Sequence, residues 1–115
     1  MPRVEHYEFG KIVINGKIFN RDVIIFPDRI IDNWWRKEGH SLCMDDIRDV
    51  LTYNPEILVI GTGYYGLMRV PEDVIKSLRE RGIEVHVAKT KEACRIFNEL
   101  IEKGKRVVAA LHLTC

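Results

Sequence analysis

Short apolar, β-branched runs alternate with turn residues in the first third of the chain. Runs at 12–14 and 17–19 flank Asn15-Gly16. This dipeptide between two such runs is a strong hairpin signal, because both residues accept positive φ. Similar runs follow at 23–26 and 30–31. We therefore predict an antiparallel β unit between residues 7 and 31.

Helix and strand patterns alternate through the rest of the chain. Apolar residues recur at helical spacing in about 44–53, 71–81 and 90–103, and strand patterns lie at 57–60, 83–87 and 106–112. The regular alternation at 83–87 favours a strand at a sheet edge. This order predicts one α/β domain over 1–115, with an N-terminal antiparallel β-hairpin layer and about three helices.

Composition and charge narrow the class of protein. The 115 residues fit one folded domain, and 18 Lys and Arg against 17 Asp and Glu leave a net charge of +1. Without a basic excess, nucleic acid is not an expected partner. No apolar run reaches the ~20 residues needed to span a bilayer. We therefore expect a cytoplasmic protein with no membrane association and, from three widely spaced cysteines, no disulfide framework.

A glycine-rich segment directly follows the apolar run at 57–60. Its glycines have the spacing G-x-G-x-x-G, which lets the backbone turn with its N–H groups uncovered, as in an anion-binding loop. In an α/β sheet this loop lies beyond the carboxyl end of a strand, where ligands bind. The candidate ligand- or partner-binding residues here are Gly61, Thr62, Gly63, Tyr64, Tyr65, Gly66 and Arg69.

Dinucleotide binding is not predicted, and no cofactor is expected. Residues 67–70 separate Gly66 from Pro71, and a proline in a helix interior costs about 3 kcal/mol, so the helix should begin at Pro71. No acid follows the next strand to hold a ribose hydroxyl. Alternatively, Gly61 and Gly63 only permit a tight exit from the sheet, while Tyr64 and Tyr65 cover the core or a partner.

Two tryptophans and three histidines complete the set of candidates. Trp34 and Trp35 point to opposite faces if extended, so one can enter the core while the other anchors a partner. His40, in a loop, is a further binding candidate without an identifiable acid or base partner, and we predict no catalytic residues. His86 and His112 could meet only on neighbouring strands, and two imidazoles without a third ligand do not predict a metal site.

Several short blocks occur in an order that resembles a known family. They are Phe9-Gly10, Trp34-Trp35-Arg36, Gly39-His40-Ser41, Ile60-Gly61-Thr62-Gly63, Arg69-Val70-Pro71 and the tail at 108–115. Together they resemble the Mth-type domain family of unknown function, whose eukaryotic relatives include an adipogenesis-associated protein and a mitochondrial complex I assembly factor. The resemblance implies a three-layer α/β fold around a mixed central sheet, and assembly or adaptor roles.

Two functions from different classes remain open. The preferred hypothesis is a non-catalytic binding or assembly module, which uses the glycine loop and the Trp34-Trp35 segment to recognise an unidentified protein or a second copy of itself. The alternative is an enzyme that binds a nucleotide or another small anionic ligand at the same loop. Both depend on loop amides that face outward between Thr62 and Gly66.

Overall fold

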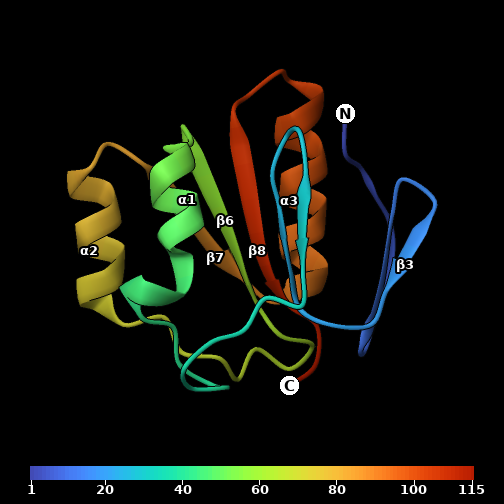
Figure 1. The fold of residues 1–115 in the computed structure, drawn as a ribbon, viewed down its shortest axis with the longest axis horizontal. Coiled ribbons are helices and arrows are strands. Elements are labelled where there is room, and N and C mark those ends of the chain that lie inside the picture. Colours follow the sequence, from blue (N-terminus) through green and yellow to red (C-terminus); the bar gives the residue numbers. More distant parts are fainter.

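A computed structural model describes residues 1–115 and shows three layers (Figure 1). The central layer is a five-stranded mixed sheet with the order β5-β4-β8-β6-β7. Its strands are β4 (Val23–Ile25), β5 (Ile30–Asp32), β6 (Ile57–Thr62), β7 (Glu84–Ala88) and β8 (Val107–His112). Strands β6, β7 and β8 are mutually parallel where they pair, whereas β4 is antiparallel to both β8 and β5. The predicted α/β class and mixed sheet are confirmed.

Helices cover both faces of this sheet. One face carries a 3₁₀ turn (η1, Met44–Ile47) that continues into α1 (Arg48–Tyr53), followed by α2 (Glu72–Glu80); the other carries α3 (Thr90–Glu102). Asn54 ends α1 in a left-handed conformation, directly before Pro55. Pro71 is the N-cap of α2, which confirms that the helix begins after a long loop rather than at Gly66. No helix is both long and apolar enough to cross a bilayer.

The first third of the chain divides between two sheets, so the prediction of one antiparallel unit is wrong in this respect. Strands β1 (Val4–Glu8), β2 (Lys11–Ile14) and β3 (Lys17–Phe19) form a separate antiparallel sheet, whereas β4 and β5 join the central one. Asn15 and Gly16 both have positive φ, which confirms the predicted tight turn. The division occurs because β4 pairs with β8 from the far end of the chain, Val23 opposite Leu111.

Two apolar cores lie on opposite sides of the central sheet, each of 15 buried residues. Alternate side chains of β6 enter different cores: Ile57 and Val59 pack towards α3 and the three-stranded sheet, while Leu58 and Ile60 pack towards α1 and α2. Because both faces are covered, β6 and β8 are fully buried along their length. The carboxyl ends of these strands are therefore buried on both faces of the sheet.

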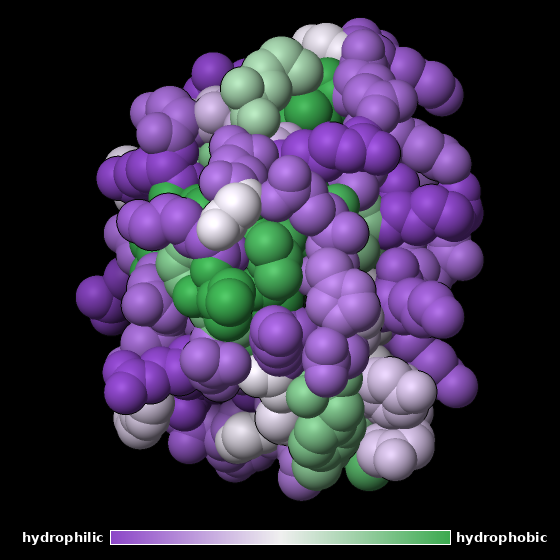
Figure 2. Space-filling model, turned by 90° about the vertical axis from the view of Figure 1, so that its right-hand side faces the viewer, coloured by the Kyte–Doolittle hydropathy of each residue, from purple (hydrophilic) through white to green (hydrophobic).

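The three-stranded sheet forms one flank of the molecule. Figure 2 looks onto this flank and shows a small hydrophobic patch surrounded by hydrophilic side chains. Ile18, opposite Val13 in the register of β2 and β3, is the exposed large hydrophobic residue of these strands.

Candidate functional site

The glycine loop lies at the carboxyl ends of β6 and β8, as predicted, but most of its amides are bonded within the protein. The segment at 113–115 continues from β8 and runs alongside the loop, accepting its hydrogen bonds. The internal bonds are Gly63 N to Thr90 Oγ1 (2.8 Å), Tyr64 N to Thr114 O (2.6 Å), Gly66 N to Gly63 O (3.3 Å), Leu67 N to Cys115 O (3.0 Å) and Met68 N to Thr62 O (3.1 Å). The amides of Gly63, Tyr64 and Gly66 are thus used internally and do not face outward as expected, whereas the Tyr65 amide has no such bond.

Close packing explains why glycine is required at positions 61 and 63. A Cβ at Gly61 would lie 2.8 Å from Thr90 Oγ1, and one at Gly63, where φ is +107°, would lie 2.3 Å from the carbonyl carbon of Cys115. These distances are far shorter than ordinary van der Waals contact. The two glycines allow the loop to approach α3 and the segment after β8.

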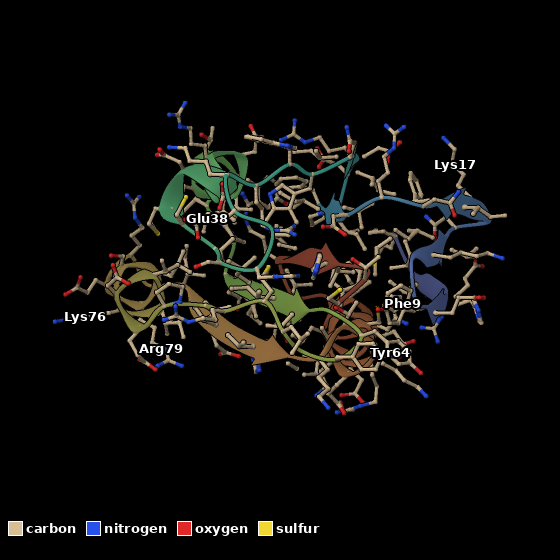
Figure 3. All side chains as sticks on the ribbon, turned by 90° about the horizontal axis from the view of Figure 1, so that it is seen from below. Phe9, Lys17, Glu38, Tyr64, Lys76 and Arg79 are labelled. Atoms are coloured by element: carbon tan, nitrogen blue, oxygen red, sulfur yellow. The ribbon has the colours of Figure 1, made fainter.

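The side chains of the same loop form an exposed aromatic patch with a residue from the three-stranded sheet. Phe9 from the β1–β2 turn, Tyr64 and Tyr65 lie in mutual contact, with ring centroids 5.9 Å (Phe9–Tyr64), 6.1 Å (Phe9–Tyr65) and 5.1 Å (Tyr64–Tyr65) apart. Figure 3 shows Phe9 and Tyr64 side by side. Tyr65 is 61% exposed, and neighbouring Leu67 is also exposed. We call Phe9, Tyr64, Tyr65 and Leu67 the aromatic patch.

A buried polar cluster lies behind the loop, and sequence reasoning missed it. Asp22 precedes β4, Arg36 lies in the segment after β5, and His112 ends β8. The Asp22 carboxylate accepts hydrogen bonds from Arg36 Nη1 (2.8 Å) and from the Leu113 amide (2.7 Å). His112 Nδ1 lies 2.8 Å from Asp22 Oδ2 and 2.9 Å from Arg36 Nη2.

Burial shapes the electrostatics of this cluster. It opposes ionisation of Asp22, but hydrogen bonds from His112, the Leu113 amide and Arg36 outweigh that effect and hold the pKa of Asp22 below its ordinary value. Arg36 also donates to Gly39 O and packs 4.7 Å from the Trp34 ring. Asp22 thus compensates a guanidinium that is almost fully withdrawn from solvent.

The cluster pairs a carboxylate with an imidazole. His112 Nε2 and Arg36 Nε are buried and have no hydrogen-bond partner. No Ser, Thr or Cys side chain is hydrogen-bonded to the far imidazole nitrogen, where a His–Asp pair would activate a nucleophile. The geometry instead ties the segment before β4 to the end of β8, next to the glycine loop.

The remaining sequence candidates occupy different environments. Trp34 is 6% exposed and donates from Nε1 to Asp46 O (2.8 Å), whereas Trp35 is 74% exposed. The prediction that one ring enters the core is confirmed, and Trp34 is not available to a partner. Arg69 is exposed and its amide donates to His40 O (2.7 Å). His40 is exposed as well, with its ring 6.2 Å from that of His112.

No group of three or more His, Cys, Asp or Glu side chains is arranged to hold a metal ion. Strand β6 separates His86 on β7 from His112 on β8, so the two imidazoles do not come together. All three cysteines are free thiols.

Comparison with known proteins reveals the family. The family described as "Protein of unknown function (DUF498/DUF598)" matches residues 4–112. The chain belongs to this family. Among curated members of similar sequence is the human NADH dehydrogenase [ubiquinone] 1 alpha subcomplex assembly factor 3, 30% identical over 111 residues that cover 94% of this chain and 59% of the relative. The chain thus spans less than two thirds of that protein.

Solved structures agree with the assignment to DUF498/DUF598. A conserved hypothetical protein from Pyrococcus horikoshii is 31% identical, with a TM-score of 0.81 over 98% of this chain and 99% of its own. A Bordetella pertussis protein described as a Mth938-like domain shares the fold, at 22% identity and a TM-score of 0.69 over 97% of this chain and 85% of its own. The resemblance to the Mth-type domain family is confirmed.

Proposed function

We propose that this DUF498/DUF598 protein is a non-catalytic binding module that supports the assembly of a protein complex, and that the aromatic patch is its recognition surface. The observation that carries the proposal is the cluster of exposed rings of Phe9, Tyr64 and Tyr65 in mutual contact. A relative that covers almost the whole of this chain is an assembly factor, which supports the same class of function.

The hydrogen-bonded backbone beneath the aromatic patch favours binding of a partner to a preformed surface. Hydrogen bonds to Thr90, Thr114 and Cys115 use the amides of Gly63, Tyr64 and Leu67, so these amides do not bond a partner. These hydrogen bonds hold the backbone from which the two tyrosine rings project. Ordering flexible side chains and loops on binding costs free energy, so a rigid surface retains more of the energy of its contacts. Tyrosine is also enriched among the residues that dominate interface energies.

The small-anion alternative has weaker support in this geometry. Arg69 is exposed beside the loop, but of the amides from Gly63 to Met68 only that of Tyr65 lacks an internal hydrogen bond. Thermal unfolding with phosphate, adenosine, NAD and NADP separates the two functions. Ligand at a hundred times its dissociation constant would stabilise the fold by about 2.7 kcal/mol. We expect no shift, and a reproducible shift with any of the four would favour the alternative.

Affinity purification from the source cells tests the preferred function. We expect the wild-type protein to retain a defined protein that Tyr65→Ala and Phe9→Ala retain poorly. Ile18→Ala is the matched control, because Ile18 is also exposed and apolar but lies on the outer face of the three-stranded sheet. Equal recovery with all four proteins would contradict the aromatic patch as the recognition surface.

A further inference from the structure

Strand β7 forms a free edge of the central sheet and lacks the usual protection of such edges. It pairs with β6 over all five residues without a register shift, and no strand lies on its other side. Figure 3 shows it at the outer border of the sheet. Natural edge strands are kept short or carry bulges, lysines or prolines that prevent pairing with another chain. Residues 84–88 contain no bulge, lysine or proline, and their one carboxylate, that of Glu84, lies at the start of the strand.

The hydrogen-bond pattern identifies the backbone groups that face outward. The Glu84 amide donates to Glu56 O (3.1 Å), so Glu84 directs its backbone groups towards β6. Because successive residues of a strand direct these groups to opposite edges, His86 and Ala88 also bond inward. Val85 and Val87 therefore present an N–H and a C=O each to the free side.

The exposure of the side chains also indicates that the free edge of β7 is available to a partner strand. Val85 and Val87 share one face of the strand, yet Val85 is 8% exposed under α2 while Val87 is 43% exposed. The other free edges differ: β3 and β5 have only three residues each, and β1, which also has five, carries a register shift between Val4 and His6 and two glutamates. β7 combines a longer edge with uncovered apolar surface.

We propose that β7 pairs antiparallel with β7 of a second copy of this chain, about a two-fold axis at His86. This register sets Val85 opposite Val87 of the second copy, and both residues have outward backbone groups, so each of the two symmetric pairs exchanges two hydrogen bonds. All five residues of the strand take part. A shift of the axis to Val85 would use Ile83, whose amide already donates to Leu78 O.

The side chains that lie opposite each other across the two β7 strands are compatible with this pairing. Valines meet valines on one face, where β-branched cross-strand pairs stabilise a sheet. On the other face Glu84 lies opposite the small Ala88 of the second copy, so no carboxylates oppose each other, and the two His86 imidazoles lie opposite each other at the axis, each against the Glu84 carboxylate of its own chain. The two central sheets would then form one continuous ten-stranded sheet, twice the five strands of each copy.

Affinity should be modest. A five-residue strand junction is well below the 1,200–2,000 Å² or so of standard stable interfaces. We therefore expect a dissociation constant between about 1 µM and about 1 mM, and a monomer–dimer equilibrium that depends on concentration.

Sedimentation from about 1 µM to about 1 mM protein tests the pairing, with micromolar affinity within that range. Wild type should shift from monomer to dimer. Val87→Pro removes an N–H that faces away from β6 and restricts φ at this edge position, where proline is tolerated. Val87→Lys places a charge on the exposed face. Both should stay monomeric with native circular dichroism. Val87→Thr is the control that keeps β-branching and the donor, and it should dimerise. A monomeric wild type, or dimerisation unaffected by both disruptive variants, would overturn the proposal.

Amide hydrogen exchange of wild type gives a second readout that needs no variant. The Val85 and Val87 amides should exchange at least about tenfold more slowly at the high end of the concentration range, which a 1.4 kcal/mol difference in opening produces. The His86 amide, bonded to β6, should not change. Concentration-independent exchange at Val85 and Val87 would contradict the pairing. Tyr65→Ala should leave dimerisation intact, which separates this result from the proposed function.

Discussion

Removal of the Asp22 carboxylate should strongly destabilise the fold. In Asp22→Ala the buried Arg36 guanidinium loses its counter-charge, and the Leu113 amide loses its acceptor. Removing one partner of a buried ion pair typically costs about 3–5 kcal/mol, because an uncompensated charge stays in a low-dielectric site. This is a large part of the roughly 5–15 kcal/mol by which domains are stable. At about 4 °C or more per kcal/mol, the Tm should fall by at least about 12 °C.

Urea unfolding of Asp22→Ala, Arg36→Met and the double variant measures this effect. Replacing both members of a buried pair by apolar groups is often close to neutral, so the double variant should be more stable than Asp22→Ala. Asp28→Ala is the surface control, expected within about 0.5 kcal/mol of wild type. If Asp22→Ala costs less than about 1 kcal/mol, the assignment of a compensated buried charge is refuted.

The cluster of Asp22, Arg36 and His112 should also make the free energy of unfolding depend on pH in acid. Because the pKa of Asp22 is lowered in the folded protein, its ionised form contributes stability above the unfolded pKa of about 3.9. That contribution is lost as pH falls through the folded pKa. The difference in unfolding free energy between wild type and Asp22→Asn should therefore shrink below about pH 4. A constant difference from pH 7 to about pH 2 would contradict the lowered pKa.

Three further predictions concern other parts of the fold. Gly63→Ala should cost about 1–3 kcal/mol in urea unfolding, because of its positive φ and the clash with the segment after β8, whereas Gly39→Ala, with open space around it, should be close to neutral. Burial raises the pKa of the Cys94 thiol to about 12, so a thiol reagent at pH 8 should modify only the two half-exposed cysteines of the native protein, and modification of all three would contradict this. Trp34→Ala should cost about 3–5 kcal/mol and Trp35→Ala less than about 0.5 kcal/mol; similar losses would show that the buried and exposed rings are wrongly assigned.

The local sequence pattern is sufficient for most elements of the fold but not for their partners. The Asn15-Gly16 turn, the helix after Pro71 and the edge position of the strand near Val85 follow from residues close together in the chain. The division of the first third into two sheets does not, because it depends on the pairing of β4 with β8, whose residues are almost 90 positions away.

The contacts within the candidate site also depend on residues far apart in the chain, which the local sequence pattern does not bring together. The position of the loop follows from the sequence, which leaves open whether Tyr64 and Tyr65 cover the core or a partner, but the acceptors for the amides of Gly63, Tyr64 and Leu67 are Thr90 and the segment at 114–115. Likewise, no spacing rule brings Phe9 to Tyr64, or Asp22 to His112. These contacts arise only when β8 lies between β4 and β6 and carries the end of the chain past the loop.

The most direct test of the proposed function is the affinity of the purified partner, once isolated, for wild type and for Tyr65→Ala. Truncation of an interface hot spot costs at least about 2 kcal/mol, so the dissociation constant should rise about 30-fold or more while the Tm of the module stays within the range of a surface substitution. An unchanged dissociation constant for Tyr65→Ala, together with an unchanged constant for Phe9→Ala, would contradict recognition through the aromatic patch.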